Sequence, residues 1–176
     1  VVNIAAGVHD NLVVVAQTLD MYGRVMETQN GKVSVNDDQT VESVKIEAPQ
    51  TDVYYVRLYL KENGRTVSEN FYVEGREADK LTALNSLPKV ALNKKESFAK
   101  KGDVHVGEIT VANPTATPAL LIRLNLVGSD GKQILPVIYS DNYFSLMPGE
   151  EKSISVSYND EDGRGATPSV SLSAFN

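Results

Sequence analysis

The sequence predicts an all-β protein made of two tandem antiparallel β-sandwiches. Three features of the 176 residues support this: a hydrophobic period of two, frequent turn signals and an internal repeat. Short strands at intervals of about ten residues, separated by turn residues, are typical of sandwich folds. No stretch keeps an apolar helical period over four turns.

Segments that are rich in β-branched residues, or that alternate between apolar and polar residues, are the expected strands. In one of them Ile154, Val156 and Tyr158 share a face while serines occupy the other, which is the pattern of a half-buried antiparallel strand. The expected strands are 11–20, 40–49, 53–62, 104–113, 119–128, 152–159 and 169–175.

Turn dipeptides lie between several of these segments. Asn-Gly or Asp-Gly at the centre of 62–65, 129–132 and 29–32 predicts three hairpins, because both dipeptides accept positive φ at low cost. Pro148 and Gly149 predict a type II turn.

The repeat indicates two copies of one sandwich type. Arg57–Leu60 leads into an Asn-Gly turn, and Arg123–Leu126 leads into an Asp-Gly turn in the same way. Alternation weakens between Gly75 and Leu84, where we expect the linker. The predicted domains are therefore 1–78 and 79–176.

Composition excludes several classes of protein. A net charge of -6 and a pI near 4.9 argue against a nucleic-acid partner. No apolar run approaches the roughly 20 residues of a membrane helix, so no membrane insertion is expected. There is no Cys, and the apolar start without Met reads as part of a longer protein. One small basic cluster is interpreted as a solvated loop: Lys94, Lys95, Lys100 and Lys101.

Several strings resemble glycoside hydrolase family 2 enzymes of the β-mannosidase and exo-β-glucosaminidase type. "VHVGEITVANPTATPALLIRLNL" (104–126) and "ILPVIYSDNYFSLMPGEEKSISV" (134–156) are similar to their C-terminal immunoglobulin-like domain. So is "VSLSAFN" (170–176), although that family often has Trp where this chain has Phe175. The strings at 11–25 and 53–73 are similar to the preceding immunoglobulin-like domain. The resemblance implies two tandem immunoglobulin-like β-sandwich domains.

The resemblance also implies a role. It places the chain after the catalytic (β/α)₈ barrel, as a non-catalytic fragment that supports the barrel, with the remaining domains of the same polypeptide as its partner. The implied parent is a retaining exo-glycosidase, a β-mannosidase or an exo-β-glucosaminidase, which hydrolyses O-glycosyl bonds. Such parents are expected to be periplasmic or secreted in bacteria.

We expect no catalytic residue in this chain. Retaining glycosidases need two carboxyl groups about 5–5.5 Å apart, and the resemblance implies an acid/base Glu directly after an Asn, a dipeptide that is absent here. The acidic loops 36–38 and 159–162 lack the spacing of a recognised calcium loop. His9 and His105 are too far apart in sequence to propose as a pair. No metal site and no cofactor are predicted.

The segment Tyr139–Glu150, "YSDNYFSLMPGE", has two interpretations. In one it binds carbohydrate: rings stack on a pyranose, and an acid and an amide bind its hydroxyls. The residues would be Tyr139, Asp141, Asn142 and Tyr143, and the chain would be a carbohydrate-binding module. In the other, the polar pair fixes a bend, one aromatic ring enters the core, and Pro148-Gly149 turns the chain. The second is favoured because the chain has no Trp. A spacer sandwich of a surface protein ranks last.

Overall fold

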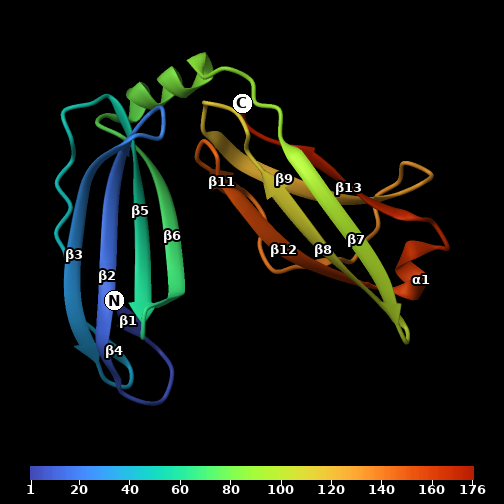
Figure 1. Cartoon of the computed structure of the whole chain (residues 1–176), viewed down its shortest axis with the longest axis horizontal. Helices are drawn as coiled ribbons and strands as arrows, with labels where there is room; N and C mark the ends of the chain where they lie inside the picture. The colour runs from blue at the N-terminus through green and yellow to red at the C-terminus, as the bar shows by residue number, and fades with distance from the viewer. The chain divides into compact units, whose positions relative to one another are not determined.

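The computed structural model describes residues 1–176 and confirms the predicted all-β, antiparallel fold. The chain divides into two compact units, Val1–Ser86 and Leu87–Asn176 (Figure 1). The sequence placed the boundary between residues 78 and 79, at the start of the 3₁₀ helix η1 (Ala78–Ser86). That helix belongs to the first unit, where Leu81 lies against Gly75. Neither of the two helices is long and apolar enough to cross a membrane.

The second unit is a sandwich of two sheets with strand orders β10-β12-β8-β7 and β11-β9-β13. Its core lies between them, with Ile109, Ile122 and Ile154 fully buried. Alternation is as predicted, because Ile154, Val156 and Tyr158 of β12 are buried and the residues between them are not. The elements are β7 (Asn93–Lys101), β8 (Val104–Ala112), β9 (Ala119–Gly128), β10 (Ile138–Tyr139), β11 (Phe144–Leu146), β12 (Glu151–Asn159), helix α1 (Asp160–Gly163) and β13 (Pro168–Ser173).

The first unit has one long sheet, of order β3-β2-β5-β6, and one short pair, β1-β4. Its core cluster is Leu12, Val14, Val33 and Val35, against which Val44 also packs. The strands are β1 (Val2–Asn3), β2 (His9–Asp20), β3 (Val25–Val35), β4 (Gln39–Thr40), β5 (Val53–Glu62) and β6 (Arg65–Gly75).

Two of the predicted hairpin positions have different outcomes. Asn63 and Gly64, both at positive φ, connect β5 to β6 as expected. The hairpin predicted at 29–32 is wrong, since this stretch lies inside β3. A Cβ on Gly31 would lie 2.4 Å from Ser43 Oγ and 3.0 Å from Val44 Cγ1, so this glycine serves close packing rather than a turn.

The turn between β2 and β3 lies earlier, at residues 20–24, where the sequence offered no Asn-Gly or Asp-Gly signal. Asp20 accepts hydrogen bonds at Oδ1 from the backbone N–H groups of Tyr22 and Arg24, each at 2.9 Å. Its Oδ2 also pairs with Arg24 Nε at 2.8 Å. A side-chain acceptor therefore replaces the turn dipeptide.

Two further predictions about strands need correction. The lysine cluster does not form a loop: Lys94, Lys95, Lys100 and Lys101 all lie on β7. Phe98 makes this strand part of the sandwich, because its ring packs where a Cβ on Gly107 of β8 would lie, 2.6 Å away. The strand predicted at 40–49 is also wrong beyond its first residue, since β4 ends at Thr40.

A buried asparagine holds together one end of the second unit. Asn113, only 1% exposed, donates from Nδ2 to the carbonyls of Thr117 at 2.8 Å and Leu146 at 3.0 Å. Its Oδ1 accepts the N–H of Thr115 at 3.1 Å. These bonds tie the end of β8 to the following loop and to the end of β11.

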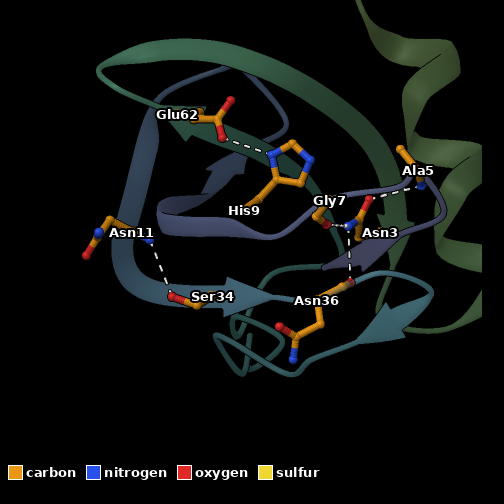
Figure 2. A network of polar contacts seen from close by, with 8 residues as sticks. All are labelled: Asn3, Ala5, Gly7, His9, Asn11, Ser34, Asn36 and Glu62. Atoms are coloured by element: carbon orange, nitrogen blue, oxygen red, sulfur yellow. Dashed lines mark hydrogen bonds and ion pairs between the residues drawn. The ribbon is translucent and has the colours of Figure 1, made fainter.

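The first unit contains the same arrangement, which Figure 2 shows. Asn3 donates to the carbonyls of Gly7 at 3.0 Å and Asn36 at 3.1 Å, and it accepts the N–H of Ala5 at 3.1 Å. In both units the partners lie 2, 4 and 33 residues after the asparagine. We call Asn3 and Asn113 the bracket asparagines.

The bracket asparagines show which strands correspond. β2 and β9 follow them, and each pairs with two neighbours: β3 and β5 in the first unit, β11 and β13 in the second. The repeat predicted from the sequence matched Arg57–Leu60 of β5 with Arg123–Leu126 of β9. The structural counterpart of β9 is β2, so that residue alignment is wrong.

Replacing Asn113 with alanine should destabilise the second unit by about 2–3 kcal/mol, because buried backbone groups of the loop lose their partners. Urea unfolding, followed by hydrogen exchange of peptides from residues 87–176, measures this. Asn93→Ala, at an exposed position of β7, is the matched control. A loss below about 0.5 kcal/mol for Asn113→Ala would contradict this role of the bracket.

Candidate functional site

The segment Tyr139–Glu150 contains the residues that the sequence singled out. The side chain of Asn142 bonds to the backbone of β9 as a neighbouring strand would. Its Oδ1 accepts the N–H of Leu124 at 2.8 Å, and its Nδ2 donates to the carbonyl of Leu124 at 3.0 Å. The same Oδ1 also accepts the N–H of Tyr143 at 3.0 Å. The amide oxygen and one amide hydrogen of Asn142 therefore serve to fix the bend.

Asp141 and Tyr139 are also engaged inside the fold. Asp141 Oδ1 accepts the N–H of Asn142 at 2.8 Å, and its Oδ2 pairs with Lys152 Nζ at 2.6 Å. The hydroxyl of half-buried Tyr139 accepts the N–H of Leu126 at 2.8 Å. Burial raises the pKa of this phenol, although the hydrogen bond from Leu126 and the charge of Arg123 act in the opposite direction.

Of the two neighbouring aromatic residues, Tyr143 and Phe144, one enters the core, as the structural interpretation of this segment predicts. Phe144 is buried in the core, whereas Tyr143 is 58% exposed. Leu146 is buried, and Gly149, at a φ of 79°, turns the chain towards β12 with a bond from the Glu150 N–H to the Met147 carbonyl at 3.1 Å. Of the four residues proposed to bind carbohydrate, Tyr143 is the one whose side chain is largely exposed.

Tyr143 is one of three exposed large apolar side chains on or next to strand β9 and the segments bonded to it. Leu121 of β9 is 51% exposed between two buried neighbours, and Phe175, whose N–H bonds to the Leu120 carbonyl, is 44% exposed. We call Leu121, Tyr143 and Phe175 the apolar face. Sequence reasoning missed Leu121 and Phe175. The run of apolar residues 119–122, which breaks the alternation, was the signal for Leu121.

The backbone of the apolar face is strained. Leu121 has a φ of 49° and Tyr143 a φ of 59°, in the left-handed region that residues with a Cβ rarely adopt. The register of β11 on β9 shifts at this point, and the Leu121 N–H bonds to Ser145 Oγ at 3.2 Å. Strained non-glycine residues persist where the surrounding structure or a function requires them.

A second polar cluster joins β7 to β13. Glu96 accepts the N–H of Val170 at 2.8 Å and the hydroxyl of Ser169 at 2.9 Å, and it pairs with Lys94 Nζ at 3.0 Å. Lys94 Nζ donates to the Val170 carbonyl. Burial alone would raise the pKa of Glu96, but the hydrogen bonds from Lys94, Val170 and Ser169 together lower it below its usual value.

A third cluster lies where helix α1 follows β12. Asp160 pairs with Lys100 Nζ at 2.5 Å and with His105 Nε2 at 2.6 Å. Hydrogen bonds from Lys100 and then His105 lower the pKa of Asp160. The His105 ring stacks on Tyr158 with centroids 4.8 Å apart. His9, in the first unit, bonds instead to Glu62 at 2.9 Å (Figure 2). No three His, Asp or Glu side chains come together in a group able to hold a metal ion.

Comparison with known proteins shows the family to which this chain belongs. The profile of the exo-beta-D-glucosaminidase Ig-fold domain matches residues 70–176, which include all of the second unit. The chain belongs to this family of immunoglobulin-fold domains. The resemblance drawn from the sequence, to immunoglobulin-like domains of such glycoside hydrolases, is thereby confirmed.

Individual relatives agree with the family. An exo-beta-D-glucosaminidase of Streptomyces avermitilis is 32% identical over 145 residues, covering 70% of this chain and 16% of the relative. A mannosylglycoprotein endo-beta-mannosidase of Lilium longiflorum is 59% identical over 44 residues, 25% of this chain and 4% of that protein. The Ig-fold chain thus spans about a sixth of the first relative's length.

A solved structure shows the same fold. The exo-chitosanase CsxA of Amycolatopsis orientalis matches with a TM-score of 0.87 at 23% identity, covering 99% of this chain and 24% of CsxA. Both units of the Ig-fold chain therefore have counterparts in one known architecture.

Asn142→Ala should destabilise the second unit by about 2 kcal/mol, because Leu124 loses bonds to both of its backbone groups. Tyr143→Ala should change stability by less than about 0.5 kcal/mol, since its side chain is exposed and only its backbone is bound. Thermal unfolding of the two variants under one set of conditions compares them. Equal effects would contradict the assignment of Asn142 as the brace.

Glu96 should make the second unit acid-sensitive. A carboxyl whose folded pKa is lowered stabilises the fold above its unfolded pKa, near 4.3, and loses that effect as pH falls through the folded value. Glu96→Gln should therefore cost about 1–2 kcal/mol at pH 7 and much less near pH 2. Urea unfolding at both pH values tests this, and an equal loss at pH 2 would contradict it.

Proposed function

We propose that this chain is a non-catalytic supporting module of a glycoside hydrolase related to exo-β-D-glucosaminidases and β-mannosidases. In that parent, other domains of the same polypeptide would form a catalytic barrel that hydrolyses O-glycosyl bonds with retention. The family match and the small share of each relative that the chain covers support this proposal.

The observation that carries the proposal is the apolar face. Leu121, Tyr143 and Phe175 are 51%, 58% and 44% exposed, and exposed apolar side chains mark a site of interaction with a partner when they gather on one surface. Two of them, Leu121 and Tyr143, are exposed on residues whose backbone has a positive φ. We infer that another part of the parent polypeptide covers the apolar face. The matched part is only 16% of the Streptomyces avermitilis relative, so a parent of that length would contain about six times as much chain.

The chemistry beside the apolar face favours a protein partner over a sugar. Binding a pyranose requires free donors and acceptors for its hydroxyls, as well as a ring. Asn142 makes three bonds to backbone, Asp141 is paired with Lys152, and the Tyr139 hydroxyl accepts a backbone N–H. A dry contact with apolar side chains leaves those bonds intact.

Carbohydrate binding is a second candidate, favoured by one observation. Tyr143 and Phe175 have exposed aromatic rings, which are able to stack on a sugar. In that case the chain would act as a carbohydrate-binding module and hold polysaccharide near the catalytic site.

Leu121→Asp in the full parent polypeptide should shorten the half-life of glycosidase activity on heating by at least about tenfold, since burying one such side chain contributes about 1.5–3 kcal/mol. The same change should leave the melting temperature of the 176-residue chain within about 2 °C. Ile138→Asp, at an exposed apolar position of the other sheet, is the matched control. An unchanged half-life for the Leu121 variant would overturn the docking proposal.

Titration with mannan, chitosan oligosaccharides and mannose, followed by tyrosine fluorescence, separates the two candidates. Docking to protein predicts no saturable change at millimolar sugar. A saturable change that is lost in Tyr143→Ala but kept in Tyr22→Ala, an exposed tyrosine of the first unit, would favour the carbohydrate-binding module.

A further inference from the structure

Two Asn-Gly dipeptides of the chain lie in different surroundings, although the sequence predicted a hairpin turn at both. Asn63 and Gly64 connect β5 to β6, whereas Asn30 and Gly31 lie inside β3. Asparagine is a thermolabile residue. It loses its side-chain amide most readily before glycine, which has no Cβ to hinder attack by its backbone nitrogen. The fold therefore gives two copies of one reactive dipeptide different freedom to react.

The turn between β5 and β6 leaves its asparagine free to react. Asn63 and Gly64 are both exposed, and both have a positive φ, of 50° and 79°. No atom lies within 4 Å of the position that a Cβ on Gly64 would occupy. The ladder ends at the pair Glu62 and Arg65, and no hydrogen bond holds the Gly64 N–H or the Asn63 side chain. The Gly64 nitrogen can therefore approach the side-chain carbonyl of Asn63.

The same dipeptide in β3 is held within a ladder. Asn30 lies opposite Val15 and Gly31 lies opposite Val14, inside a strand of 11 residues. A Cβ on Gly31 would lie 2.4 Å from Ser43 Oγ, so the space beside this glycine is filled. Cyclisation requires the backbone to rotate until the glycine nitrogen reaches the asparagine Cγ. Paired strand residues make such a rotation only when they open locally, so β3 protects Asn30.

We propose that Asn63 is a site of spontaneous deamidation that the fold permits, and that the fold protects Asn30. The Gly64 nitrogen loses its proton to hydroxide and bonds to Cγ of Asn63, which closes a succinimide ring. The Cγ–Nδ2 bond breaks, and Nδ2 takes up a proton and leaves as ammonia. Water then opens the ring. Breaking the N–Cγ bond gives aspartate, and breaking the bond from N to the main-chain carbonyl carbon gives isoaspartate. Water is the one co-reactant, and nothing is oxidised or reduced.

Deamidation at this turn changes the charge and the main chain beside a polar contact between strands. Glu62, the residue before Asn63, contacts His9 Nδ1 at 2.9 Å (Figure 2). A new carboxylate at residue 63 places a second negative charge next to Glu62. Isoaspartate also adds one CH₂ to the main chain, and a two-residue hairpin turn has a backbone geometry that this extra group disturbs. The modified chain is therefore more acidic and looser at the end of the β5–β6 ladder. This inference is independent of the proposed function.

The two dipeptides allow a test within one molecule. Folded and guanidinium-unfolded samples of the full chain are incubated at mildly alkaline pH and then digested with trypsin. Cleavage after Lys and Arg releases Asn63 in peptide 62–65 and Asn30 in peptide 25–32. Mass spectrometry measures the fraction of each peptide in which the amide has become an acid. In the folded chain Asn63 should convert at least tenfold faster than Asn30. In the unfolded chain the two rates should agree within about threefold, because the ladder of β3 is then absent.

Asn63→Gln is the variant control, since its longer side chain does not form the succinimide ring. The unsubstituted chain should accumulate an acidic species on isoelectric focusing, and Asn63→Gln should form at least fivefold less of it in the same time. A ratio of rates below tenfold in the folded chain would overturn the proposal. A ratio that stays above tenfold in the unfolded chain would also overturn it, because the difference would then come from the sequence alone. Equal amounts of the acidic species in the two proteins would exclude Asn63 as its source.

Discussion

The buried amide of the bracket asparagine is the constraint on which both units depend. An Asn side chain has two donor hydrogens and one carbonyl acceptor, and burying them without partners is costly. Each bracket satisfies them with three backbone groups at fixed offsets, two in the next loop and one at the end of a distant strand. The amide therefore fixes the loop that follows it and joins that loop to the end of the strand 33 residues later in the chain.

Side chains take the place of strands elsewhere in the second unit. Asn142 bonds both backbone groups of Leu124, and Lys94 and Glu96 bond both backbone groups of Val170. In each case a side chain, rather than another strand, binds backbone N–H and C=O groups of the three-stranded sheet. This explains why the most chemically suggestive segment of the sequence serves the scaffold: its polar groups are needed to close a sheet that has few strands.

Strands were predicted best from the sequence where every second side chain is buried. The strands at 119–128 and 152–159 were recognisable because alternation records burial directly. The hairpin predicted at Asn30-Gly31 was wrong because the glycine there makes room for Ser43 and Val44. No local pattern distinguishes a turn glycine from a packing glycine. The lysines of β7 concealed a strand because Lys94 and Glu96 face a backbone edge that only the fold creates. For the candidate site, local reasoning anticipated the bend at Asn142 but could not anticipate Phe175, which reaches the apolar face only through the return of the last strand.

The ion pair of Lys94 and Glu96 on the edge of β13 has a consequence for aggregation. An uncovered strand edge is a template for another chain, and here that edge is shielded by a carboxylate that accepts the Val170 N–H. Neutralising the carboxylate weakens the shield while the strand itself remains in place. Acidification would thus leave this edge of β13 open to strand-to-strand association before the sandwich has melted.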